Sequence, residues 1–307
     1  MERTFVDEFL YVVDHPGFLA LTEETWKNRW FPYQIPLAVD AKDVTKLSET
    51  DKEFYKFLFI FLGLAEKLVN FNIDELLVGI HSHDAKHYYD EQEAMENIHG
   101  KVYANILNLF FEGDKAKMRQ YAHFVVGNPG LKAKLSWLHD KVREATTIAE
   151  KVLVFLLIEG IFFVSSFYSI GLLRVRGICN GVCLANDYIS RDELLHTRAA
   201  ALLYNTLVDP DRKPPVHWIH NLFREAVDVE IRFIRERGRG VTAVNIEDII
   251  SFLKATADRM LTQIKLPILY GELAPSGCPL AFNACVKNIN FFEREGTDYS
   301  SSVTNDL

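Results

Sequence analysis

The stretch AMENIHGKVYANILNLF, residues 94–110, carries the pattern Glu-x-x-His at Glu96 and His99 within an otherwise largely apolar helical period. Positions i and i+3 lie on one face of an α-helix, so the carboxylate and the imidazole point inward together. The same pattern returns at Glu193 and His196, at the end of ISRDELLH (189–196). A single copy is more often a surface ion pair, but two copies call for another explanation.

Each copy follows a lone acid in a strongly apolar stretch. These acids are Glu66 in FLGLAEKLVNFN (61–72) and Glu159 in VFLLIEGIFFVSSF (154–167). A buried carboxylate is costly without a partner, and metal coordination supplies one. Four carboxylates with two imidazoles are the known set by which helical bundles hold two metal ions. Oxygen-rich ligands with one imidazole per metal suit iron or manganese better than zinc.

Composition restricts the class of protein. The 307 residues are 49% hydrophobic and 25% charged, which is ample material for a globular core. A net charge of −8 argues against a nucleic-acid-binding face, which would be basic. The four cysteines show neither CxxC spacing nor secreted-scaffold density, and the acidic N-terminus lacks the apolar run of a signal peptide. We therefore predict a soluble cytoplasmic protein with free thiols.

The apolar periodicity is helical along most of the chain, and no segment alternates at period two for long enough to suggest a sheet. The predicted fold class is all-α, a helical bundle around a buried dinuclear metal site. The segment HSHDAKHYYDE (81–91) is predicted as a joint and GNPG (127–130) as a turn. The expected helices are 48–77, 90–111, 130–144, 148–176, 183–207, 216–237 and 246–264.

Residues 152–173 form a candidate transmembrane segment, since Glu159 is their only charged member. A helix that is apolar all round also fits the centre of a large bundle. A single span here would place Glu66 and Glu193 on opposite sides of a membrane, so that the two ligand sets could never meet. We predict a buried central helix and no lipid contact; the alternative is a single-pass host-membrane protein.

A second candidate metal cluster lies in the polar segment before the first Glu-x-x-His pattern. Its spacing is irregular, which favours a solvated loop over a metal site. Its members are His81, His83, Asp84, His87 and Asp90.

Tyr103 lies one turn beyond His99 and therefore on the same helical face. It is either an ordinary core tyrosine or a redox-active phenol beside the metals, and periodicity alone leaves both open. Three apolar side chains spaced by whole turns from the predicted ligands can enclose this phenol: Phe163, Phe167 and Ile189.

Taken together, these motifs resemble the small, radical-generating subunit of class I ribonucleotide reductase. The resemblance runs from about Trp30 to the end of the chain, and the tail YSSSVTNDL (299–307) is similar to the herpesvirus version. It implies a ferritin-like di-iron domain over residues 46–285. An N-terminal arm over residues 1–45 would precede it, and a flexible tail over residues 286–307 would follow.

The resemblance also implies the cofactor, two iron ions per chain with manganese as the alternative. Most of the family has aspartate where this chain has Glu66, and the additional methylene can change how that carboxylate binds. One metal would be held by Glu66, Glu96 and His99, and the other by Glu159, Glu193 and His196.

The resemblance assigns roles around the metals as well. Tyr103 would store the radical inside the apolar pocket of Phe163, Phe167 and Ile189. The residues that transfer the radical towards a separate large subunit would be Trp30, Asp192 and, in the tail, Tyr299.

The implied activity is reduction of ribonucleoside diphosphates to deoxyribonucleotides, which DNA replication requires, in the host-cell cytoplasm. The small subunit would be a homodimer and would join the large catalytic subunit in a heterotetramer through residues 299–307. The alternative is another ferritin-like di-iron oxidase, a desaturase or monooxygenase, which would need a substrate channel at the metals. A ferritin-like iron store fits poorly with a chain of this length and tail.

Overall fold

The computed structural model describes residues 5–241 and 244–280, and every regular element within these ranges is a helix. The predicted all-α class is confirmed for this part of the chain. Tyr299, Cys285 and the predicted docking segment 299–307 lie outside the described residues. The α-helices are α1 Phe5–Phe9, α2 Pro16–Asn28, α3 Ala41–Lys46, α4 Glu49–Leu77, α5 His83–Phe110, α6 Lys115–Gly127, α7 Pro129–Glu144, α8 Ile148–Gly160, α9 Val164–Val175, α10 Asn180–Thr206, α11 Val216–Arg237 and α12 Ile246–Gln263. The 3-10 turns are η1 Pro32–Gln34, η2 Leu37–Asp40 and η3 Pro210–Arg212.

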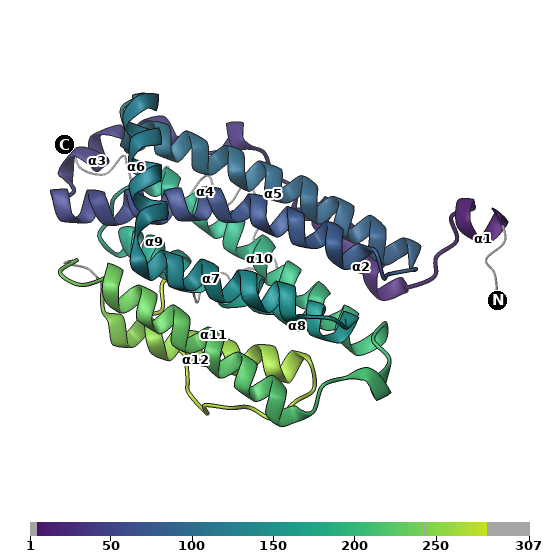
Figure 1. Ribbon diagram of the computed structural model, residues 1–307. Coiled ribbons are helices and arrows are strands. Elements are labelled where there is room, and N and C mark those ends of the chain that lie inside the picture. The colour runs from purple at the N-terminus through teal and green to yellow at the C-terminus, as the bar shows by residue number, and fades with distance from the viewer. Residues whose placement is uncertain (1–4, 242–243, 281–307) are drawn as a thin grey trace.

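The longest helices, α4 and α5, lie side by side along one side of the bundle, with α8 and α10 below them (Figure 1). Ser48 begins α4 as predicted, because its hydroxyl accepts the Asp51 N–H at 3.1 Å. Ser82 begins α5 in the same way through the Ala85 N–H. The four central helices each turn one face towards a common axis, and those faces carry the predicted ligands.

The start of α5 differs from the prediction. The segment 81–91 is not a joint, because α5 begins at His83, seven residues before the predicted start. Asp14 accepts the His83 N–H at 2.7 Å, and Asp84 accepts the Tyr11 O–H at 2.7 Å and the His15 N–H at 2.6 Å. These bonds bind the N-terminal segment to the first turn of α5 and engage the Asp84 carboxylate of the histidine-rich cluster.

The predicted helix 148–176 is two helices, α8 and α9, separated by residues 161–163. At this junction the Phe162 N–H reaches back five residues to the Leu157 carbonyl at 3.3 Å, which is π-type rather than α-type bonding. By length and composition alone, Ile148–Val175 could cross a membrane. Its most apolar 18-residue window is completely buried in the bundle, as expected of a core helix.

The N-terminal segment brings one further site residue to the bundle. Helix α2 packs against α5 and α10, and the buried Trp30 follows it directly. Helix α1 stands apart from the bundle (Figure 1). Cys179, Cys183 and Cys278 are buried.

Candidate metal centre

The structure brings all six predicted ligands together in the middle of the bundle. They come from α4, α5, α8 and α10, and every one is buried. They form two overlapping groups, in each of which the possible ligand atoms lie within 4.8 Å of one another. Glu96 and Glu193 belong to both groups, as bridging carboxylates would. The groups are Glu66, Glu96, His99 and Glu193, and Glu96, Glu159, Glu193 and His196.

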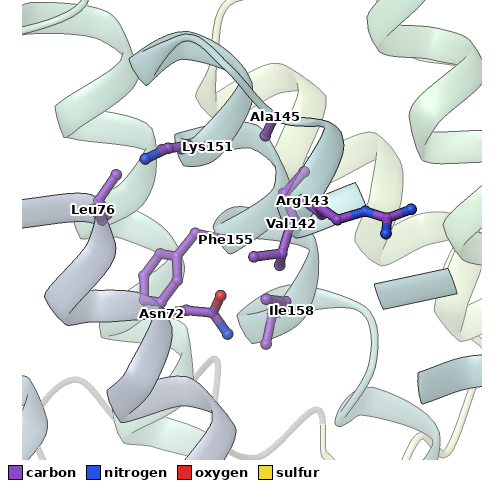
Figure 2. Close-up of a pocket in the computed structure, with 9 residues that line it drawn as sticks. Asn72, Leu76, Val142, Arg143, Ala145, Lys151, Phe155 and Ile158 are labelled. Atoms are coloured by element: carbon purple, nitrogen blue, oxygen red, sulfur yellow. The ribbon is translucent and has the colours of Figure 1, made fainter. Parts of the chain in front are cut away.

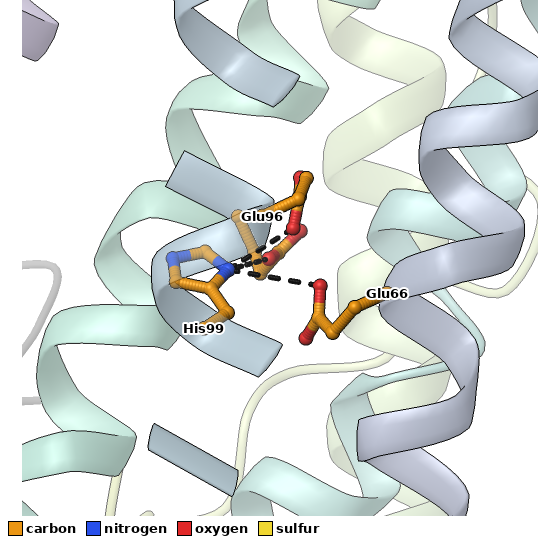
Figure 3. A group of neighbouring side chains, drawn as sticks. Glu66, Glu96 and His99 are labelled. Atoms are coloured by element: carbon orange, nitrogen blue, oxygen red, sulfur yellow. Dashed lines mark hydrogen bonds and ion pairs between the residues drawn. The ribbon is translucent and has the colours of Figure 1, made fainter. Parts of the chain in front are cut away.

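In the first group the Nδ1 atom of His99 faces the carboxylates. It lies 3.0 Å from Glu96 Oε2, 3.3 Å from Glu193 Oε1 and 3.8 Å from Glu66 Oε2. Figure 3 shows the carboxylates of Glu66 and Glu96 turned towards this ring nitrogen. His99 therefore presents Nδ1 as its ligand atom and leaves Nε2 for another partner.

The second group repeats this arrangement around His196. Its Nδ1 atom lies 3.0 Å from Glu96 Oε1, 3.2 Å from Glu193 Oε2 and 3.7 Å from Glu159 Oε2. The two imidazoles thus face each other across the shared carboxylates, with ring centroids 6.1 Å apart. The internal repeat in the sequence corresponds to a near-symmetric pair of half-sites.

The donor set fits two divalent metal ions. One oxygen each of Glu66 and Glu159 is buried and has no hydrogen-bond partner. Burial, followed by repulsion from Glu96, raises the pKa of Glu66, while burial and Glu193 raise that of Glu159. Buried carboxylates without partners are costly, and bound cations would relieve both the missing contacts and the mutual repulsion.

A hydrogen-bonded chain leads away from the first group. Asp192 Oδ2 accepts the indole N–H of Trp30 at 2.7 Å and lies 3.1 Å from His99 Nε2. The Trp30 ring also stacks on His99, with centroids 6.0 Å apart. All three side chains are buried. A carboxylate behind a ligating imidazole fixes the tautomer and orientation of its ring.

Tyr103 is buried beside this group, and its O–H has no hydrogen-bond partner. Burial raises its pKa well above the usual value, and the Glu66 charge adds to the effect. The Phe59 ring of α4 lies 6.5 Å from the Tyr103 ring. The three predicted pocket residues belong to the same hydrophobic core: Phe163, Phe167 and Ile189.

The sequence interpretation missed Gln92, which lies one turn before Glu96. Its amide donates to Glu159 Oε1 at 3.1 Å and approaches Glu96 Oε1 at 3.5 Å. The sequence signal for Gln92 was its position four residues before Glu96, on the face of α5 that carries the predicted ligands. A glutamine at that spacing is usually a solvated residue, so the signal is weak.

One cavity borders the second group. Its volume is about 250 Å³, and Glu159 and Glu193 form part of its wall. Phe252, Arg259 and Cys278 line it as well. A separate hollow of about 310 Å³ lies between α4, α7 and α8 and contains none of the predicted ligands (Figure 2).

Comparison with known proteins identifies a family. The sequence pattern of "Ribonucleotide reductase, small chain" matches residues 8–275. A ribonucleoside-diphosphate reductase small subunit of Equine herpesvirus 2 is 63% identical over 303 residues, covering 99% of both chains. The corresponding subunit of Human herpesvirus 8 type P is 59% identical over 302 residues, covering 98% of this chain and 99% of that protein.

Solved structures share the fold at low sequence identity. The dimanganese(II)-NrdF of Streptococcus sanguinis superimposes with a TM-score of 0.79 at 19% identity, covering 92% of this chain and 98% of that one. The Rnr4 homodimer of Saccharomyces cerevisiae gives a TM-score of 0.79 at 21% identity, with coverage of 95% and 89%.

Proposed function

The chain belongs to the ribonucleotide reductase small-chain family, in its class I herpesvirus branch, and from this premise we propose that Tyr103 bears its radical. Its function is that of a ribonucleoside-diphosphate reductase small subunit, an oxidoreductase component. One observation carries the assignment of Tyr103: a fully buried phenol without a hydrogen-bond partner lies one turn from His99. The apolar core around it would keep water and reductants from the phenoxyl oxygen.

The dinuclear centre would be held by the six buried ligands in two sets. Glu66, Glu96 and His99 would bind one metal. Glu159, Glu193 and His196 would bind the other. Bound iron, or manganese as in the streptococcal neighbour, would supply, after oxidation by an oxygen-derived oxidant such as O2, the oxidising power to remove an electron from Tyr103. The protein's own contribution is to bury and orient these donors and to share Glu96 and Glu193 between the two sets.

We propose that the radical leaves the site along His99, Asp192 and Trp30. The two hydrogen bonds to Asp192 Oδ2 support this route, because they hold the imidazole and the indole in fixed positions on one carboxylate oxygen. Such bonds let electron transfer proceed with only short proton displacements. Tyr299 would continue the path beyond the described residues.

The partners would be a second copy of this chain and a large catalytic subunit. The homodimeric yeast neighbour supports the first. For the second, residues 299–307 end in Asn305, Asp306 and Leu307. An apolar side chain beside two negative charges suits a shallow pocket with a basic group. The buried state of Ile148–Val175 supports a soluble protein of the host-cell cytoplasm.

The test uses the full chain loaded anaerobically with Fe(II) and then exposed to O2. We expect a sharp tyrosyl absorption band and a matching radical signal in electron paramagnetic resonance. Tyr103→Phe should lose both and still bind metal. Tyr88→Phe is the matched control, since Tyr88 is another buried phenol without a partner and should be dispensable. A radical that survives in Tyr103→Phe would contradict the assignment and favour the other ferritin-like oxidases.

A further inference from the structure

A buried ammonium group contacts the junction between α8 and α9. Lys134 of α7 is almost completely buried. Its Nζ atom donates to the Phe162 carbonyl at 2.7 Å and lies 2.7 Å from Glu230 Oε2 of α11. The junction is thus held by a charged pair from two helices that carry no predicted ligand.

Among the described residues, aromatic rings and a hydroxyl group surround the ion pair of Lys134 and Glu230. Lys134 Nζ lies 4.1 Å from the centre of the Phe61 ring and 4.3 Å from that of Phe233. The Ser165 hydroxyl of α9 donates to the second Glu230 oxygen. Every hydrogen-bonding contact of the pair therefore leads either to the other member or to the region just after Glu159.

Stability alone does not account for such a pair. Removing two charges from water is costly, and apolar residues of similar volume in their place are often neutral or stabilising. If an ion pair is not needed for stability, its other contacts indicate which role it has. Here the additional contact of the ammonium is a backbone carbonyl at the one interruption of the apolar stretch Ile148–Val175.

That interruption adjoins the metal centre. Phe162 follows Glu159 by three residues and directly precedes Phe163. The Phe162 N–H already departs from α-helical bonding by reaching the Leu157 carbonyl. The conformation of residues 161–163 therefore determines how the last turn of α8 ends and where it presents the Glu159 carboxylate. No such helix junction adjoins Glu66, because Glu66 lies inside the uninterrupted α4.

We propose that Lys134 and Glu230 are positioning residues for the metal set of Glu159, acting through the Phe162 carbonyl. This inference rests on the proposed dinuclear centre. It predicts that loss of the pair weakens the binding of one metal and not of the other. A general role of the pair in folding would not produce this difference.

The test is an anaerobic titration of the metal-free full chain with Co(II), followed by visible absorption. Wild type should bind two Co(II) ions. In Lys134→Met/Glu230→Leu, we expect one Co(II) bound as in wild type and the other at least about tenfold more weakly. The melting temperature of the metal-free protein should stay the same or rise. Amide hydrogen exchange over residues 160–164 should become faster.

Asp51→Leu/Arg176→Met is the matched control. It removes a partly buried ion pair between the start of α4 and the end of α9, at the opposite end of α9 from the junction. We expect both Co(II) ions to bind to it as in wild type. Lys134→Met alone serves as a second variant, because Glu230 can then become neutral by protonation; it should weaken the same single Co(II).

The inference is overturned if both variants at the junction bind two Co(II) ions with wild-type affinity. It is also overturned if both ions are weakened equally together with a lower melting temperature, since this would indicate a purely structural pair. If wild type itself binds fewer than two Co(II) ions, the proposed dinuclear centre fails first and the inference fails with it.

Discussion

The half-site built from α4 and α5 and the half-site built from α8 and α10 present the same donor atoms in different surroundings. Behind His99, a carboxylate and an indole continue the hydrogen bonding into the protein. Beside Glu159 lie the Gln92 amide, an interrupted helix and a cavity of about 250 Å³. The same set of ligands therefore does not imply the same role. Hydrogen bonds connect the first half-site to residues outside the ligand set, whereas the second half-site borders a cavity.

The difference follows from the helices that carry the acids. Glu66 lies in the middle of an uninterrupted amphipathic helix whose ends are fixed far away. Glu159 lies one residue before the end of α8, in a stretch with no polar face. A ligand near a helix end can be displaced by small changes in the following loop, whereas a ligand in mid-helix cannot.

The largest expected effect comes from removing the ligand of the second half-site. Glu159→Ala leaves that metal without its terminal carboxylate, so the dinuclear centre should not form. We expect one iron per chain instead of two after anaerobic loading, no radical, and nucleotide reduction lower by about a thousandfold or more with the large subunit. Two tightly bound irons in this variant would show that Glu159 is not a ligand.

The next prediction distinguishes radical transfer out of the first half-site from metal binding in that half-site. Trp30→Phe keeps an aromatic ring but removes the N–H that bonds to Asp192. The Tyr103 radical should form normally, while nucleotide reduction falls by about a hundredfold. Trp26→Phe, at an exposed position of the neighbouring α2, is the control and should change neither quantity. Equal losses of radical and turnover in Trp30→Phe would mean that Trp30 only supports the site.

A smaller effect is expected from Gln92, whose amide bonds to Glu159 in the second half-site. Gln92→Leu removes the donor and keeps much of the volume. Loss of a hydrogen bond to a metal ligand typically weakens metal binding by about tenfold or more. We expect about tenfold weaker binding of one Co(II), with the other unchanged. If the two ions are affected alike, the amide serves both half-sites.

The smallest effect concerns how the helices of the two half-sites begin. The first turn of α10 donates its Gly181 and Val182 N–H groups to Asp40, whereas Ser82, which does not titrate, caps α5. Burial raises the pKa of Asp40 to about 6. A carboxyl with a raised folded-state pKa is fully stabilising below its unfolded pKa, and this contribution is lost as the pH rises towards 6.

Wild type should therefore lose about 1 kcal/mol of unfolding free energy between pH 5 and pH 7 through Asp40. Asp40→Asn does not titrate and should lack this component. The measurement is urea unfolding of the metal-free protein at both pH values, for wild type and variant in parallel. The same pH dependence in both chains would exclude Asp40 as its source.

The clustering of the six predicted ligands could be predicted from the sequence, because a helix converts a spacing of three residues into a shared face. Most of the long helices also followed from apolar periodicity, and α11 has the predicted bounds of 216–237, but α2 and α6 were not predicted. Asp192 and Trp30 could be assigned only by resemblance, since 162 residues separate them. Gln92 was missed because one polar residue on a helix has no characteristic spacing.

The misplaced features share a physical cause. The start of α5 is capped by the neighbouring Ser82 and also by Asp14, from 69 residues away, and no local pattern reveals the second contact. The break between α8 and α9 lies at the apolar residues 161–163. Lys134, from another helix, donates to the Phe162 carbonyl at this break. Long-range side-chain contacts of this kind override local preferences and appear only in the folded chain.

The strongly hydrophobic stretch Ile148–Val175, whose most apolar window is completely buried, also has a consequence for synthesis on the ribosome. The helices that cover it include α10, α11 and α12, so its burial must wait until Gln263 has been translated, about 90 residues later. At typical elongation rates of about 5–20 residues per second, the nascent chain exposes this stretch for about 5–20 s. During that interval it has the length and composition that targeting factors read as a membrane anchor. We therefore expect the nascent chain to be open to chaperone capture during that interval.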